Sequence, residues 1–145
     1  MTPTEAERIG RAWRAAGGPW LARMRGVDRK GNGFTILVLH PFGDALVHDD
    51  RVATSLLPVR QAMLEQCWPD PRDPATVGCM LAIVRERYGD SSAYAVRDVV
   101  DWDRPWTFCA NIDPDDRGKD GVAHGESEAE ALVAALVAVP KGAQP

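Results

Sequence analysis

The sequence predicts an α+β fold in which helices pack against an antiparallel sheet of about five or six strands, in a sandwich-like arrangement. Three observations indicate this class. Helix caps precede several apolar segments, turns rich in glycine, proline and aspartate bound short apolar runs, and no repeat or low-complexity segment interrupts the chain. Because 145 residues is a typical size for one domain, we expect residues 1–145 to form a single α+β domain.

Capping residues predict a first helix at the start of the chain. Thr2 is a suitable N-cap, Pro3 fits the first helical position, and Glu5 completes a capping box. Gly17 should end this helix, because glycine readily adopts the left-handed conformation found after many helix C-termini.

A hairpin and a second helix are expected next. Residues 20–25 alternate in polarity, residues 34–39 are almost entirely apolar, and the intervening "DRKGNG" has turn chemistry. Residues 45–48 are expected to return as a short third strand. The pattern of residues 56–66 predicts a helix, whereas the prolines of residues 68–74 predict a loop.

The stretch "DPATVGCMLAIVRERYGD" predicts the central helix. Asp73 is a good N-cap, Pro74 suits the first turn, and Gly89 suits the C-terminal turn. Because the helix is apolar on most sides, we expect it to be buried on most sides. Gly78 in its interior costs about 1 kcal/mol relative to alanine, so we expect another backbone to pass close to it.

Strands and a final helix complete the predicted sheet. Residues 94–102, residues 106–112 and the short residues 122–124 have strand patterns, the last as an edge strand. Ser127 then caps a helix that Pro140 ends.

Two of these segments resemble a known group of proteins. "DPATVGCMLAIVRERYGD" and "GVAHGESEAEALVAALVAV" resemble segments of small uncharacterised proteins of bacteriophages and prophages. There, a DPAT-initiated buried helix precedes a β-hairpin and a "G-x-S/T-E-A-E-A-L-V-A-A-L" helix. The ending is also similar to phage ABA-sandwich domains, whose helices flank an antiparallel sheet. The resemblance covers about Pro71–Val139, implies no catalytic residues, and makes residues 1–66 a candidate family-specific elaboration.

The charge is distributed unevenly along the chain. The formal net charge is -4, yet Met1–Gly31 contains seven Arg and Lys against three acids. A basic patch can serve nucleic acid, so a small nucleic-acid-binding protein is one alternative function. Because the chain as a whole is acidic, we expect these arginines to solvate a helix face and a strand face instead. The residues of this N-terminal arginine patch are Arg8, Arg11, Arg23 and Arg25.

Cysteine usage and hydropathy predict a reduced cytoplasmic protein. Cys67, Cys79 and Cys109 are an odd number without CxxC spacing, so we expect neither a zinc site nor a disulfide. The N-terminus lacks the apolar region of a signal peptide, and no apolar run reaches the roughly 20 residues that a membrane helix needs.

Histidines and aspartates in "HPFGDALVHDD" are the residue types that ligate metals, which makes a metal-dependent hydrolase around His40 and His48 a further alternative. On a hairpin, however, His40 would pair near Ala45 and His48 near Leu37, so the two imidazoles would not converge. The loop "DPDDRGKDGVAH" also fails as a calcium loop, because arginine and histidine occupy required ligand positions. We therefore expect no metal and no cofactor.

Two tryptophans adjoin charged loops and are candidates for protein contact. Trp68 precedes "PDP" and Trp102 lies in "DWDRPW". Partly exposed tryptophan is typical of protein interfaces, but rings that lie over the edge of the core are the interpretation we favour for both. No motif of a hydrolase nucleophile, a dinucleotide site or a phosphate loop occurs, so nothing in the sequence predicts catalysis. The preferred function is a non-catalytic phage or prophage accessory protein that binds a protein partner, without nucleic acid or membrane; its oligomeric state is left open.

Overall fold

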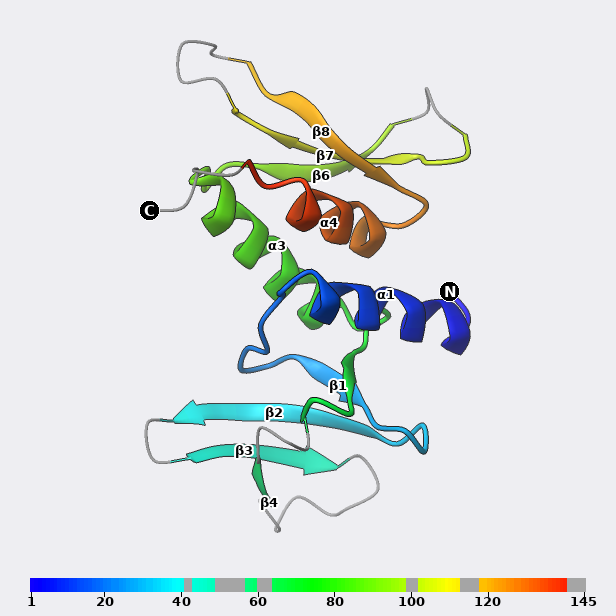
Figure 1. The fold of residues 1–145 in the computed structure, drawn as a ribbon, viewed down its shortest axis with the longest axis vertical. Helices are drawn as coiled ribbons and strands as arrows, with labels where there is room; N and C mark the ends of the chain where they lie inside the picture. Colours follow the sequence, from blue (N-terminus) through cyan, green and yellow to red (C-terminus); the bar gives the residue numbers. More distant parts are fainter. Residues whose placement is uncertain (41–42, 49–56, 60–63, 99–101, 113–117, 141–145) are drawn as a thin grey trace. The chain divides into compact units, whose positions relative to one another are not determined.

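The computed structural model describes residues 1–40, 43–48, 57–59, 64–98, 102–112 and 118–140. Its chain divides into two compact units, Met1–Cys79 (unit 1) and Met80–Pro145 (unit 2), and the boundary falls inside a helix. The fold is α+β with antiparallel strand pairing, as predicted. The described strands divide between two sheets, because the strands before the central helix pair only with one another and those after it do the same (Figure 1).

Helix α1 (Pro3–Ala15) begins as the sequence predicts. The Glu5 N–H donates to Thr2 Oγ1 at 3.2 Å, and the Thr2 N–H donates to Glu5 Oε2 at 2.7 Å. Its buried face includes Ile9 and Trp13, the latter fully buried. Gly10 on the same face allows the helix to approach closely, because a Cβ there would collide with the Pro69 carbonyl oxygen.

The sheet of unit 1 has the strand order β4-β3-β2-β1-β5. All of its neighbouring strands are antiparallel. The alternating pattern predicted a strand from Trp20, but β1 begins only at Arg25 and residues 20–24 lie outside it. Arg23 has a φ of +76°, in the left-handed region, which breaks an extended segment at that point. The strands are β1 (Arg25–Val27), β2 (Gly33–His40), β3 (Gly43–His48), β4 (Leu57–Val59) and β5 (Trp68–Pro69).

Two predictions for residues 56–74 differ from the structure. Leu57–Val59 form a strand where a helix was predicted, and residues 60–63 of that predicted helix lie outside the described residues. Trp68–Pro69 form a short strand within the predicted loop. Both strands stand at the edges of the sheet, where proline is tolerated because an edge strand leaves some N–H groups unpaired.

Helix α3 (Pro74–Tyr88) has the predicted bounds. The prediction that another backbone passes close to Gly78 was wrong. Asp73 accepts hydrogen bonds at Oδ2 from the N–H and the hydroxyl of Thr76, each at 2.8 Å, as a capping residue should. Gly78 is exposed, and a Cβ built there would meet nothing within 4 Å. Ala75 and Ala82 are also exposed, so the face of the helix that carries these small residues is open to solvent.

Unit 2 is a three-stranded sheet covered by a helix. Its strands are β6 (Tyr94–Arg97), β7 (Trp106–Ala110) and β8 (Asp120–Gly125), and α4 (Glu128–Val137) packs mainly on β7 and β8. Phe108 and Leu132 are fully buried between sheet and helix. Tyr88, at the end of α3, donates its hydroxyl to the Ala135 carbonyl at 2.7 Å and contacts the Phe108 ring.

A partly buried carboxylate ties together the loops of unit 2. Asp90 Oδ2 accepts from Lys119 Nζ at 2.6 Å and from the Asn111 N–H at 2.9 Å. Its Oδ1 accepts from the hydroxyl and the N–H of Ser92 at 2.9 and 3.1 Å. The hydrogen bond from Lys119, followed by that from Asn111, lowers the pKa of Asp90 far below its usual value. One side chain thus links the end of α3 to segments beside β7 and β8.

Candidate functional site

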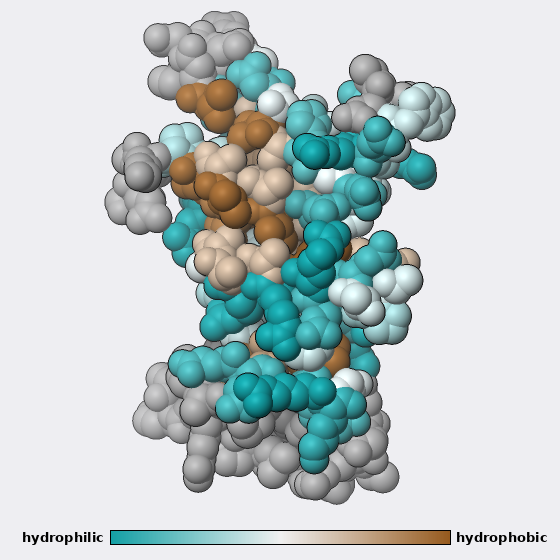
Figure 2. Space-filling model, turned by 45° about the vertical axis from the view of Figure 1, so that its right-hand side comes forward, coloured by the Kyte–Doolittle hydropathy of each residue, from teal (hydrophilic) through white to brown (hydrophobic). Residues whose placement is uncertain are grey.

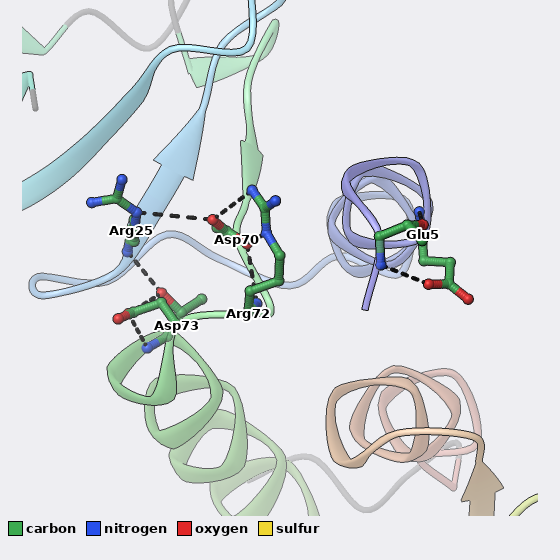
Figure 3. Close-up of polar contacts among 7 residues, drawn as sticks. Glu5, Arg25, Asp70, Arg72 and Asp73 are labelled. Carbon is green, nitrogen blue, oxygen red and sulfur yellow. Dashed lines mark hydrogen bonds and ion pairs between the residues drawn. The ribbon is translucent and has the colours of Figure 1, made fainter.

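A buried aspartate in unit 1 organises two arginines (Figure 3). Asp70 follows β5 and is 4% exposed. It accepts two hydrogen bonds from Arg72, with Nε to Oδ1 at 2.8 Å and Nη2 to Oδ2 at 3.0 Å, and Arg25 Nε lies 3.8 Å from Oδ2. The hydrogen bonds to Asp70 raise the pKa of Arg72. Two guanidinium groups around one carboxylate leave this cluster with a formal charge of about +1.

The loop between β1 and β2 adds two further cations. Asp28 Oδ1 accepts from the backbone N–H groups of Lys30 and Asn32 at 2.8 and 2.9 Å. Gly31 has a φ of +82°, which glycine adopts without strain. The loop conformation is therefore fixed by its own aspartate, and the side chains of Arg29 and Lys30 are exposed. Among the described residues, neither of these two side chains has an ion-pair partner.

A surface pocket of about 340 Å³ lies where the loop, the start of α1 and the segment after β5 meet within unit 1. Three of its eight lining residues are cations and one is an acid. The acid, Glu7, is already paired with Arg11 at 2.8 Å. The pocket is lined by Pro3, Glu7, Val27, Arg29, Lys30, Gly31, Trp68 and Arg72. The arrangement favours an anionic ligand.

The four arginines of the predicted patch occupy different environments. Arg11 places its guanidinium 4.5 Å from the centroid of the Trp68 ring and also pairs with Glu7, whereas Arg25 faces Asp70. Arg8 and Arg23 are exposed. An arginine that already pairs with a carboxylate attracts a phosphate backbone less strongly. The geometry therefore does not favour these four arginines as a nucleic-acid site.

The two tryptophans predicted to contact a partner differ sharply in exposure. Trp68, expected to be partly exposed, is only 6% exposed, because β5 pairs with β1 on one side and α1 packs closely at Gly10. Trp102 is 82% exposed and lies in the turn between β6 and β7. Only Trp102 presents its ring to solvent.

Other exposed apolar side chains gather in unit 2. Five of the six described large hydrophobic residues that are exposed belong to it, and Figure 2 shows hydrophobic residues on its surface. Tyr94 and Val96 are 43% and 42% exposed on β6, which is an edge strand of its sheet. An edge strand with exposed apolar side chains can accept another strand.

Strand register separates the two histidines. In the β2–β3 hairpin, His40 pairs with Gly43 and His48 with Phe34, rather than near Ala45 and Leu37 as predicted. Six residues of β2 therefore separate the two positions, or about 20 Å at about 3.3 Å per residue. One metal ion cannot bridge that backbone separation. Among the described residues, no group of three or more histidines, cysteines and carboxylates has the arrangement of a metal site; residues 113–117 of the "DPDDRGKDGVAH" loop lie outside them.

Cys67, Cys79 and Cys109, all of which the structure describes, are not joined in a disulfide. Cys67, Cys79 and Cys109 are each partly buried, and burial raises the pKa of Cys67 and of Cys79. A raised pKa lowers the thiolate fraction at neutral pH, so neither of these two is activated as a nucleophile.

Fold and surfaces together define an α+β protein whose two units each contain an antiparallel sheet and which displays a basic pocket and an exposed tryptophan. No protein-family model, curated protein or solved structure significantly matches this chain. None of the described helices is long and apolar enough to cross a membrane.

Sequence reasoning missed the pocket cations Arg29, Lys30 and Arg72. The first two stand in a loop whose composition signalled only a turn, and Arg72 stands among prolines. They line one pocket because β5 pairs with β1, with Trp68 opposite Val27. The excess of Arg and Lys in Met1–Gly31 was the signal available for part of the set.

Proposed function

We propose that this chain is a non-catalytic binding protein that contacts a protein partner through the turn and edge strand of unit 2. The observation that carries the proposal is the 82% exposure of Trp102. Covering a large aromatic ring that was in contact with water lowers the free energy of the complex. Tryptophan is also enriched among the residues that dominate binding energy.

Edge strand β6 extends the contact surface beyond the tryptophan. It pairs with β7 on one side, and its exposed Tyr94 and Val96 add apolar area. Unit 2 contains twelve Asp and Glu against seven Arg and Lys, so the matching surface of the partner should be basic.

The biological setting belongs to the same proposal. The resemblance of Pro71–Val139 to phage and prophage proteins supports an accessory role in a phage or its host, with helices packed on sheets in a sandwich-like manner and a location in the cytoplasm. The resemblance rests on caps and turns, which describe a fold, so it names no partner.

Affinity capture from a bacterial lysate, with the bound proteins identified by mass spectrometry, tests the contact. Trp102→Ala should remove a specific partner, at a cost of about 2 kcal/mol or more in binding if the ring anchors the interface. Val137→Ala is the matched control, because Val137 is also exposed, at 71%, but lies in α4. Equal capture by wild type and Trp102→Ala would contradict the proposal.

A further inference from the structure

The pocket of unit 1 has a local charge opposite to that of the whole chain. The charged side chains that line it are three cations and one acid, a formal excess of +2, whereas the chain carries -4. These groups are Arg29, Lys30 and Arg72, with Glu7.

The acids near the pocket are already committed to other groups. Glu7 pairs with Arg11, Asp28 accepts from two loop N–H groups, and Asp70 is buried between Arg72 and Arg25. The uncompensated charge is therefore that of Arg29 and Lys30, which have no ion-pair partner among the described residues.

We propose that this pocket binds a phosphate monoester on a small molecule. A monoester carries about -1.5 to -2 charges at neutral pH, which matches the local excess, and its three oxygens accept several hydrogen bonds. Arg29 and Lys30 supply donors from one side and Arg72 from another. The volume of about 340 Å³ fits a ligand of nucleotide size, with Val27, Pro3 and Trp68 as the apolar part of the wall.

Rigidity of Arg72 and of the loop backbone favours binding over non-specific attraction. Arg72 is held by two hydrogen bonds to Asp70, at 2.8 and 3.0 Å, and the loop is held by Asp28. Donors fixed in advance lose less conformational entropy when a ligand arrives. This inference is independent of the protein contact in unit 2.

Calorimetric titration of the full chain at low salt with adenosine monophosphate and with adenosine tests the proposal. The monophosphate should bind saturably and adenosine should not, because they differ only in the phosphate group. The double substitution Arg29→Ala, Lys30→Ala should weaken monophosphate binding by about tenfold or more, since two charge-assisted hydrogen bonds are lost. Both side chains are exposed on a loop that Asp28 holds, so the variant should fold normally.

The matched control is Arg97→Ala, which removes an exposed cation of β6 that does not line the pocket and should leave the affinity unchanged. A dinucleoside monophosphate, whose single phosphodiester carries one charge, should bind more weakly than the monoester. Three outcomes overturn the proposal: no saturable binding of the monophosphate, equal binding by the double variant, or equal binding of adenosine. Equal binding of the phosphodiester overturns the assignment to a monoester.

Discussion

Two glycines inside helices have opposite surroundings. Gly10 in α1 stands where a Cβ would collide with the Pro69 carbonyl oxygen and touch Trp68, whereas Gly78 in α3 faces open space. The sequence shows both as helix-interior glycines, and nothing local distinguishes them. The distinction comes from tertiary pairing, because β5 lies against α1 while small residues leave one face of α3 open.

Substituting alanine at these glycines should therefore change stability in opposite directions. Gly78→Ala should raise the free energy of unfolding by about 0.5–1 kcal/mol, since alanine has the higher helix propensity and meets no neighbour. Gly10→Ala should lower it by about 1–3 kcal/mol through overpacking. Urea denaturation followed by circular dichroism measures both. A stabilised Gly10→Ala would mean that α1 does not pack closely on β5.

At the scale of elements, caps and turn residues predicted more of the fold than hydrophobic alternation did. The bounds of α3, the capping box of α1 and the N-cap of α4 at Ser127 are confirmed, because each depends on hydrogen bonds between residues close in sequence. The strand expected from Trp20 was wrong over residues 20–24, and the helix expected over residues 56–66 was wrong at Leu57–Val59, which form a strand. Both depend on pairing with distant segments, which the local pattern does not contain.

The residues of the candidate sites also divide into those that local sequence predicts and those that depend on pairing between distant segments. Trp102 stands in a charged turn, which made it a candidate for protein contact, and its ring is exposed rather than lying over the edge of the core. Burial of Trp68 and the gathering of Arg29, Lys30 and Arg72 both require the pairing of β5 with β1, which joins residues about 40 positions apart. Such long-range register is not readable from a single sequence.

Asp90 should make the stability of unit 2 depend on pH. Its folded pKa is lowered, so the unfolded chain binds more protons; its contribution is present above about pH 4 and is lost as the pH falls below that value. Asp90→Asn should lower the free energy of unfolding by about 2 kcal/mol at pH 7. The difference between wild type and variant should shrink as the pH falls from about 4, measured by urea denaturation at several pH values.

An exposed neighbouring carboxylate provides the control for this effect. Asp120→Asn removes the charge of an acid beside Lys119 that is exposed, and should change stability by no more than about 0.5 kcal/mol at any pH. If the difference for Asp90→Asn stayed constant down to pH 3, the hydrogen bonds from Lys119 and Asn111 would not be stabilising the charged carboxylate.

At the scale of the whole molecule, charge and exposed apolar surface are distributed differently between the units. Unit 1 contains ten Arg and Lys against nine acids, and unit 2 contains seven against twelve. Most of the exposed large hydrophobic residues that the structure describes belong to unit 2. An acidic, partly apolar surface suits a basic protein partner, and a slightly basic unit with one pocket suits a small anion.

This distribution predicts that the chain does not bind nucleic acid appreciably at physiological salt. A polyanion is repelled by the acidic excess, and of the four arginines proposed for it Arg11 and Arg25 are already engaged with Glu7 and Asp70. Fluorescence anisotropy should be measured with single- and double-stranded oligonucleotides that carry 5′-hydroxyl ends, so that the pocket meets no phosphate monoester. Micromolar binding at about 0.15 M salt that falls steeply with added salt, and that Arg8→Ala with Arg23→Ala abolishes, would establish the nucleic-acid alternative instead.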